Sequence, residues 1–512
     1  LALVDVSNQD SYIIDIFRVA GGQTRDYSFH AQGASFKVEG LNLSEPQKTG
    51  SLASPDYEWG TKLRGDYRII GQEHMDFYWT PPGEGYGFLS GVQRGSGEDT
   101  WSATWSTFDG ARLRMTMLGA PNREIIIADG PKPMEGVKYT LARDKEEGPS
   151  QYVALIEPVE GAKFLVDSFE GLTIERTDEG KLSPVAVKVV LNPEAISPKS
   201  GTWDIKALLG LGSKSGGSGK TDYIFSTLGG KAFTAKSGDE SFTTDGEYAF
   251  LRQDDKGIEH LILIKGHIFQ SPEVNLTSQD REFKGQILSV DYENQSLLVD
   301  GSLPLGEVLK GEYILISNPL YSHNSPYKIL KVEQEGSHYR IYLEDTSLLL
   351  ARGLVGRKPS GDVLPNTVAL PYSKGLRGPG SNDYFKGKLV TNGVTSTRIK
   401  AVGGDFASLI VEENQGFALG DTLLIHDVQE GDEYTICVSF TMERSQDDPT
   451  KYKVQLMSPV TLTFPEAYIT ELTLIREDGS SLNLEAEKTG GKVSFYLNPQ
   501  DVYRGKGTLK VK

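Results

Sequence analysis

Hydrophobic and polar residues alternate along most of this chain, in short runs that end at Gly, Asp or Asn. Residues Tyr12–Phe17 read Tyr-Ile-Ile-Asp-Ile-Phe, and Tyr434–Phe440 read Tyr-Thr-Ile-Cys-Val-Ser-Phe. A period of two is typical of β-strands that bury one face. We find no amphipathic helix longer than about three turns. The pattern therefore predicts an all-β protein.

The length of 512 residues exceeds what one ordinary core can organise and favours about three domains. We expect a large antiparallel β-sandwich, a supersandwich, over residues 1–275. Two smaller β-sandwich or barrel modules are expected over 276–375 and 376–512. Residues 371–383 are rich in Gly, Pro, Ser and Asn and are predicted to form a loop or linker between these modules.

A weak internal repeat connects the two smaller modules. Phe283–Leu288 resembles Phe385–Val390, and Gly311–Ile316 resembles Gly420–Ile425. The two spacings differ, so the match requires a loop insertion. Duplicated small β-modules explain the repeat, and so does chance similarity between ordinary strands.

Charge and cysteine content exclude several classes of protein. The net charge of −17 argues against nucleic acid as a partner. Hydrophobic runs stay far below the ~20 residues that a membrane-spanning helix needs, so no membrane span is predicted. Cys437 is the single cysteine, which rules out an intramolecular disulfide. Its alternating strand predicts a small apolar core residue.

A turn between two strands carries the most specific motif. Tyr12–His30 read YIIDIFRVAGGQTRDYSFH. This segment resembles the VDIFRVxGGxxHDYSFHG signature in the β-sandwich region of the heparinase II/III-like polysaccharide lyases. The resemblance continues through Arg94–Trp105, Asp109–Met117 and Tyr152–Pro158 and covers about residues 1–200.

The resemblance implies a bacterial enzyme that is secreted, periplasmic or on the cell surface. Such lyases degrade uronate-containing acidic polysaccharides, such as glycosaminoglycans or alginate, by β-elimination. One group neutralises the uronate carboxylate, a Tyr or His removes the C5 proton, and a Tyr protonates the leaving oxygen. In the family the catalytic Tyr comes from an α/α-toroid domain before the β-sandwich. The chain contains no such helical segment, so its principal catalytic residues are expected on a separate N-terminal helical catalytic fragment.

The same resemblance bears on the cofactor and on the start of the chain. Relatives carry a structural zinc at an HxHxD-type motif, which is absent here and is expected upstream of Leu1. The seven histidines show neither the HxH nor the HxxxH spacing of a zinc site, so we predict no metal or other cofactor in this chain. Leu1–Val6 read as a strand whose neighbours we expect to be missing or supplied by another polypeptide.

Two classes of function therefore compete. The first is the β-sheet portion of a polysaccharide lyase, inactive by itself. The second is a non-catalytic carbohydrate-binding or cell-surface β-scaffold. A glycoside hydrolase is a weaker third, because it needs two carboxylates opposed across a cleft.

Asp26, Ser28 and His30 share one face of a predicted strand, but they cannot form a hydrolase triad. Asp26 and His30 are about 13 Å apart along an extended strand, whereas a triad needs successive hydrogen bonds. His30 is the one candidate for a supporting role in catalysis, and a structural histidine is the alternative. The signature has His at the position of Arg25 and Gly at the position of Ala31, which weakens the comparison in this loop.

Candidate substrate-binding residues are arginines, which pair with uronates, and aromatic residues, which stack on the apolar faces of sugars. The candidates are Arg25, Tyr27, Tyr78, Trp79, Arg94, Trp101 and Trp105. Trp101 and Trp105 lie four apart in an alternating segment and share a face. Arg112 and Arg114 also share a face, about 7 Å apart. The alternative for these aromatic residues is core packing, and for the arginines it is pairing with acids on a sheet surface.

Overall fold

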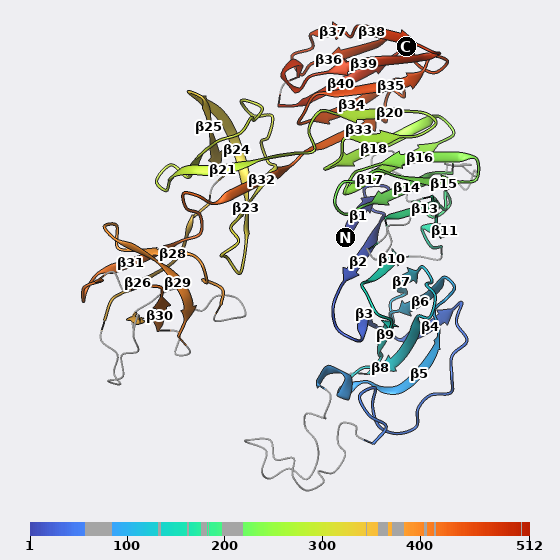
Figure 1. Cartoon of the computed structure of the whole chain (residues 1–512). Coiled ribbons are helices and arrows are strands. Elements are labelled where there is room, and N and C mark those ends of the chain that lie inside the picture. Colours follow the sequence, from blue (N-terminus) through green and yellow to red (C-terminus); the bar gives the residue numbers. More distant parts are fainter. Residues whose placement is uncertain are drawn as a thin grey trace. The chain divides into compact units, whose positions relative to one another are not determined.

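The computed structural model describes residues 1–56, 84–131, 135–160, 163–175, 182, 184–196, 219–344, 346–356, 367–370, 383–403, 407–413, 416–502 and 504–512. Over these residues the helical elements are two 3-10 turns, η1 (Glu84–Phe88) and η2 (Pro499–Asp501), and antiparallel sheets form the rest of the regular structure (Figure 1). The predicted all-β fold is confirmed. The chain packs into two compact units: unit 1 is Leu1–Ser241 with Phe250–Glu259, and unit 2 is Phe242–Ala249 with His260–Lys512.

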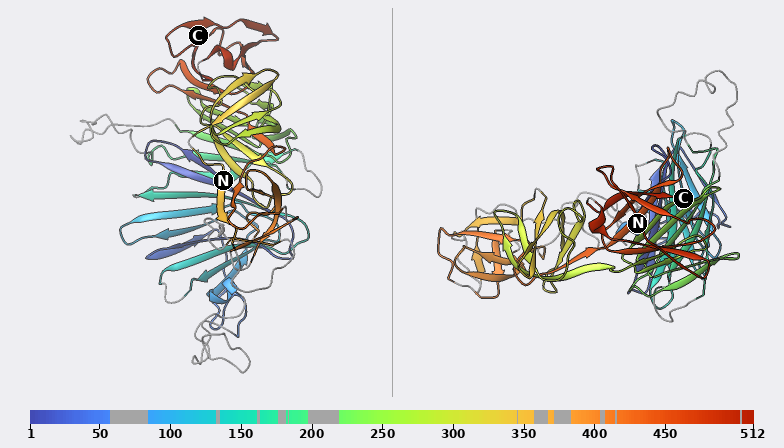
Figure 2. Two further views of the ribbon diagram at one scale, coloured as in Figure 1. Left: turned by 90° about the vertical axis from the view of Figure 1, so that its left-hand side faces the viewer. Right: turned by 90° about the horizontal axis from the view of Figure 1, so that it is seen from above.

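Unit 1 contains a six-stranded sheet in the order β1-β2-β10-β7-β6-β4, whose blue and cyan strands are seen side by side in Figure 2. Its strands are β1 (Ala2–Asp5), β2 (Ser11–Val19), β4 (Ser35–Glu39), β6 (Trp101–Ser106), β7 (Ala111–Met117) and β10 (Ser150–Glu160). In the segment expected to lack neighbours, β1 pairs with β2 on one side and forms the edge of the sheet on the other.

A four-stranded sheet in the order β3-β9-β8-β5 packs on the six-stranded sheet. Its strands are β3 (Arg25–Gln32), β5 (Ser90–Ser96), β8 (Glu124–Asp129) and β9 (Val137–Asp144). The shared core takes Trp105 and Met115 from one sheet and Tyr27, Ile125 and Ala142 from the other. Burial of apolar area of this kind is the main stabilising contribution to a β-sandwich.

The rest of unit 1 is held by a buried charged network. Its further strands are β11 (Val166–Gly171), β12 (Thr173–Ile174), β13 (Val185–Leu191), β14 (Thr221–Ser226) and β15 (Phe233–Ser237), while β16 (Glu240–Thr244) and β17 (Tyr248–Asp254) contain residues of both units. The Asp222 carboxylate on β14 accepts hydrogen bonds from Arg252 and from the Tyr12 hydroxyl, and all three side chains are buried. This network connects the signature strand β2 to β14 and β17.

Unit 2 contains parts of two further sheets, each of which buries one face; residues 257–259, at the start of the first strand given below, belong to unit 1. One sheet includes the order β18-β33-β34-β40-β36-β37 and the other the order β19-β20-β35-β39-β38. The strands are β18 (Gly257–Ile264), β19 (Ile268–Gln270), β20 (Asn275–Ser278), β33 (Ser439–Arg444), β34 (Lys451–Leu456), β35 (Val460–Pro465), β36 (Leu472–Ile475), β37 (Ser481–Asn483), β38 (Ala486–Thr489), β39 (Lys492–Leu497) and β40 (Lys506–Val511). Phe440 and Leu509 are buried in the first sheet, and Leu462 and Phe495 in the second.

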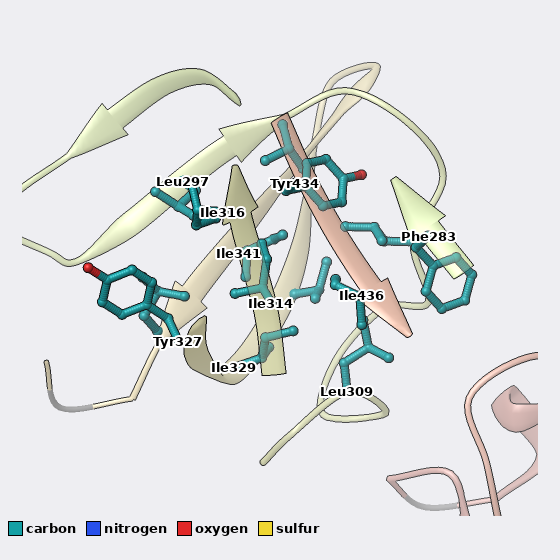
Figure 3. Packing of buried hydrophobic residues seen from close by; sticks show 14 of the residues in the cluster. Phe283, Leu297, Leu309, Ile314, Ile316, Tyr327, Ile329, Ile341, Tyr434 and Ile436 are labelled. Atoms are coloured by element: carbon teal, nitrogen blue, oxygen red, sulfur yellow. The ribbon is translucent and has the colours of Figure 1, made fainter. Parts of the chain in front are cut away.

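A closed six-stranded barrel in the order β21-β22-β25-β24-β23-β32 belongs to unit 2. Its strands are β21 (Glu282–Asp291), β22 (Ser296–Val299), β23 (Tyr313–Ser317), β24 (Ser325–Glu335), β25 (His338–Leu343) and β32 (Glu433–Cys437). Figure 3 shows Ile314, Ile329, Ile341 and Ile436 together in its interior. Closure leaves no free strand edge, which explains how a barrel this small can be stable.

The last sheet of unit 2 has the order β26-β31-β28-β29-β30-β27. Its strands are β26 (Leu349–Leu354), β27 (Thr367–Ala369), β28 (Leu389–Thr391), β29 (Ser396–Val402), β30 (Ser408–Val411) and β31 (Thr422–His426). Phe385 and Ile425 are buried in its core, as Phe283 and Ile316 are in the barrel core. The repeated segments thus place apolar residues in two separate cores, and the duplication stays a hypothesis.

The boundaries expected near residues 275 and 375 differ from those of the two units. Residues 439–512 pair with β18 and β20, through register pairs such as Leu263 with Phe440 and Leu276 with Leu462. β32 pairs with β21 and β23 and completes the barrel. Pairings between strands so distant in sequence leave no trace in a period-two pattern.

The prediction that Cys437 is a core residue is wrong, because its side chain is exposed. Tyr434 and Ile436 take the inward positions of β32 and are buried. Since successive side chains of a strand point to opposite faces, Cys437 faces outward.

Candidate functional site

The signature segment forms β2 and β3, joined by Gly21 and Gly22, which both have positive φ. Gly tolerates this conformation at no steric cost, so the turn requires it. In β3, Arg25 and Tyr27 point inward and are buried. The expected shared face of Asp26, Ser28 and His30 is therefore the outer face of the four-stranded sheet.

Asp26 is the centre of a polar cluster on that outer face. Arg143 on β9 donates from Nε to Asp26 Oδ1 at 2.8 Å and from Nη2 to Oδ2 at 2.7 Å. The Tyr86 hydroxyl of η1 also donates to Asp26 Oδ2, and the Arg143 guanidinium lies 5.4 Å from the centre of the Tyr86 ring. We call Tyr86, Asp26 and Arg143, with Glu124 and its partners described next, the Tyr86 cluster.

Cross-strand register extends the Tyr86 cluster onto β8. Glu124 lies opposite Arg143 and accepts hydrogen bonds or ion pairs from Arg94 at 2.6 Å and from Lys145 at 3.0 Å. The Arg94 and Lys145 side chains are 41% and 61% exposed, so both cations reach solvent. Burial alone would raise the pKa of Glu124, but hydrogen bonds from Arg94 and Lys145 bring it below its usual range.

Electrostatics separate the roles of the two central groups. Burial favours the neutral form of Asp26, but hydrogen bonds from Arg143 and Tyr86 outweigh it, and the pKa of Asp26 is lowered. Burial, together with the neighbouring Asp26 carboxylate, raises the pKa of Tyr86. The cluster therefore holds a carboxylate and a protonated phenol, and the phenol does not serve readily as a base.

His30 is exposed and stacks on Tyr139, which lies opposite it on β9. The two ring centres are 4.3 Å apart with an interplanar angle of 13°. The register pair of Ser28 and Leu141 lies between His30 and the pair formed by Asp26 and Arg143. The structure thus places His30 on the same face as the Tyr86 cluster, in a stacked pair of its own.

Arg25 and Tyr27 are buried in the interior of unit 1. Arg25 Nε donates to Ser150 Oγ at 2.7 Å, and its Nη1 donates to the Gly22 carbonyl at 2.9 Å. The Tyr27 hydroxyl donates to Asp15 Oδ2 at 3.0 Å. These residues fix the signature turn, and their burial argues against the predicted contact with substrate.

Trp101 and Trp105 are 2% and 1% exposed, so neither offers a ring face to a sugar. Trp105 packs between Phe29 and Phe36, with ring centres 5.5 and 5.1 Å away, and donates from Nε1 to the Lys138 carbonyl at 3.1 Å. Their shared face is the core face, and the substrate-stacking interpretation is corrected accordingly. Candidates Tyr78 and Trp79 lie outside the described residues.

Arg112 and Arg114 lie on the polar side of the six-stranded sheet, with both guanidinium groups about 4 Å from the Phe164 ring centre. Arg114 also forms an ion pair with the fully buried Glu157, whose pKa burial raises. An open cavity of about 340 Å³ beside them is lined in part by Arg114 and Asp167. The ion pair with Glu157 occupies Arg114, which leaves it less available to a uronate.

Tyr86, Arg143 and Lys145 were missed by sequence reasoning. Alternation places Asp26 on one face with Ser28 and His30, but a single sequence does not reveal which later strand lies opposite it. An arginine and a lysine in the strand Val137–Asp144 and just after it were the available signal.

Among the described residues, no group of three or more His, Cys, Asp or Glu side chains is placed to hold a metal ion. None of the helical elements in the described ranges is long and apolar enough to cross a membrane. No protein-family model matches the chain. Comparisons with curated proteins and with solved structures also gave no match. The lyase resemblance therefore stays a prediction.

Proposed function

We propose that the chain is the β-sheet portion of a polysaccharide lyase and binds a uronate-containing acidic polysaccharide at the Tyr86 cluster. The principal catalytic residues are supplied by a separate helical domain, as the resemblance implies. The observation that carries the proposal is the position of Asp26. This residue belongs to the signature segment and is held by Arg143 and Tyr86 on the outer face of the four-stranded sheet. The Asp26 and Arg143 side chains are only 7% and 12% exposed there, so Tyr86 is the member of the three that reaches solvent.

The Tyr86 cluster combines the two kinds of group that acidic sugars require. The Tyr86 side chain is 40% exposed and offers an aromatic face to the apolar side of a sugar ring. Arg94 and Lys145 pair with Glu124 at the surface. Exposed ion pairs contribute only about 0–1 kcal/mol, so a uronate carboxylate can compete for these cations.

The same geometry favours binding over cleavage. Arg143 donates hydrogen bonds from Nε and from Nη2 to the Asp26 carboxylate. Because its charge is paired with Asp26, Arg143 does not neutralise a uronate as β-elimination requires. The Tyr86 hydroxyl donates a hydrogen bond to Asp26, and the raised pKa of Tyr86 opposes its action as a base. The chain by itself is therefore expected to bind without turnover.

Affinity measurements on the full chain test the proposal. Tyr86→Ala removes the ring, and a double Arg94→Ala, Lys145→Ala variant removes the exposed cations. Each change should weaken binding of polygalacturonate or heparan sulfate about tenfold, because one stacking contact or charge-assisted hydrogen bond of about 1.4 kcal/mol is lost. Lys37→Ala, which removes an exposed lysine paired with Glu39 on another sheet, is the matched control. Equal affinities for all variants would refute binding at this cluster.

A non-catalytic carbohydrate-binding or cell-surface β-scaffold is the alternative function, and it predicts the same binding. Mixing an α/α-toroid lyase domain with this chain distinguishes the two functions. Release of unsaturated uronate that depends on both polypeptides supports the lyase, while binding that never leads to release supports the scaffold.

A further inference from the structure

A second polar groove lies in unit 2, on the exposed face of the sheet that contains β18, β33, β34, β40 and β36. These strands are neighbours in that order, as the upper part of Figure 1 shows. The groove has a volume of about 530 Å³, and residues from all five strands line it. None of the observations above identifies a ligand for this groove.

Register places the groove side chains in rows that cross the strands. His260 is opposite Glu443, Glu443 is opposite Lys453, and Lys453 is opposite Thr508. In the next row Gln455 is opposite Lys506. Neighbouring strands are about 4.8 Å apart, which is close to the advance of one pyranose ring in an extended polysaccharide. A sugar chain that crosses the strands therefore meets a new side chain at each ring.

Lys453, Arg476 and Lys506 line this groove together with the carboxylates of Glu443 and Glu477. Lys453 and Lys506 are exposed, and neither forms an ion pair among the described residues. The charge of Lys506 does act on the nearby Glu312, where it opposes the rise that burial causes in the pKa of that carboxyl group. Arg476 donates from Nε to the Asp501 carbonyl at 2.6 Å and forms no ion pair within the described part of the chain. These cations are conspicuous in a chain of net charge −17. They are complementary to an anionic ligand.

Polar acceptors accompany the cations. Gln455 Nε2 donates a hydrogen bond to Glu312 Oε1 at 3.0 Å. The carbonyl oxygen of the Gln455 side chain can therefore accept a hydrogen bond from a ligand. The carboxylates of Glu443 and Glu477 also line the groove. Acceptors of this kind bind sugar hydroxyls, so the ligand carries hydroxyl groups as well as negative charge.

We propose that this groove binds an acidic oligosaccharide, with uronate carboxylates on Lys453 and Lys506 and sugar hydroxyls on Glu443 and Gln455. The choice of ligand class rests on the proposed function, but the groove is separate from the Tyr86 cluster and belongs to the other unit. The chain thus has two sites for one class of polymer, one in each unit.

Calorimetric titration of the full chain with a short oligogalacturonate tests this proposal. The double variant Lys453→Ala, Lys506→Ala should lose one of two binding sites, or bind about tenfold more weakly at it. The matched control is Lys488→Ala, Lys492→Ala, which removes the same charge from β38 and β39 in the other sheet. Both lysines of the groove are exposed, and unchanged melting temperatures check that the fold is intact.

Three results would overturn the proposal. They are equal affinity of the groove variant and the control, equal binding of a neutral cello-oligosaccharide, and self-association of the chain that depends on Lys453.

The Tyr86→Ala variant separates this proposal from the proposed function. Residual binding in Tyr86→Ala that is abolished by adding the groove substitutions supports the groove. Binding that depends on the groove but not on Tyr86 refutes the proposed function alone, and binding that depends only on Tyr86 refutes the groove alone.

Discussion

Arg252 holds Asp222 through two hydrogen bonds of 2.7 Å, from Nε to Oδ1 and from Nη2 to Oδ2, in the interior of unit 1. The two side chains are 4% and 0% exposed. Arg252 Nη1 also donates to the Asp5 carbonyl at 2.8 Å. The pair therefore connects the first strand of the chain to strands more than 200 residues later.

Asp222→Ala should strongly destabilise unit 1, because it leaves the Arg252 charge buried without a partner. Loss of one member of a buried ion pair costs about 3–5 kcal/mol. Denaturant unfolding followed by tryptophan fluorescence measures the change. Glu39→Ala breaks an exposed ion pair with Lys37 and should change stability little. Similar effects of the two substitutions would contradict this assignment.

Trp105→Ala should destabilise the sandwich by about 3–5 kcal/mol, because it creates a cavity between Phe29 and Phe36. Phe108→Ala is the control, since that side chain is 97% exposed. If Trp105→Ala instead left stability unchanged and weakened polysaccharide binding, the original assignment of Trp105 to substrate stacking would be restored.

Asp26 should contribute to stability in a pH-dependent way. Its folded-state pKa is lowered below the unfolded value of about 3.9. A group of this kind stabilises the fold above its unfolded pKa, and the contribution is lost as the pH falls through the folded pKa. The difference in melting temperature between wild type and Asp26→Asn should therefore be largest at neutral pH and shrink below about pH 4. A difference that is constant from pH 7 to pH 3 would show that Asp26 is not stabilised as a carboxylate.

Cys437 should react with iodoacetamide in the native chain, since its side chain is exposed. Although the Cys437 side chain is exposed, partial desolvation of its thiol group raises the pKa of Cys437. Little thiolate is therefore present at neutral pH, and the rate should increase towards alkaline pH. Mass spectrometry of the intact chain follows the reaction. Labelling that requires denaturant would support the core position expected from the sequence.

Sequence patterns predicted the all-β fold because a period of two survives in almost every strand. They also predicted correctly that Trp101 and Trp105 share a face. Which face is buried depends on the partner sheet, and here the tryptophans face Tyr27 and Ile125. In β32 the alternation was read correctly but the inward set was not, because it consists of Tyr434 and Ile436 rather than Cys437.

Partners distant in the sequence account for the rest. The barrel is closed by β32, which lies about 90 residues after β25, and Asp26 meets an arginine 117 positions away. Such pairs depend on strand register, which is set by the assembled sheets and not by local pattern. For this reason sequence reasoning found only part of the Tyr86 cluster. It placed Asp26 on one face with Ser28 and His30, but did not associate Arg143 or Tyr86 with it.

The most direct test of the account is to measure, in one experiment, binding and release of unsaturated uronate by this chain alone. Ultraviolet absorbance detects the product, and the substrates are heparan sulfate, chondroitin, hyaluronan, alginate and ulvan-type polymers. We expect binding to at least one polymer, weakened by Tyr86→Ala, and no release from any of them. Release of unsaturated uronate by the chain alone would contradict it, because the residues in this chain would then form a complete catalytic site.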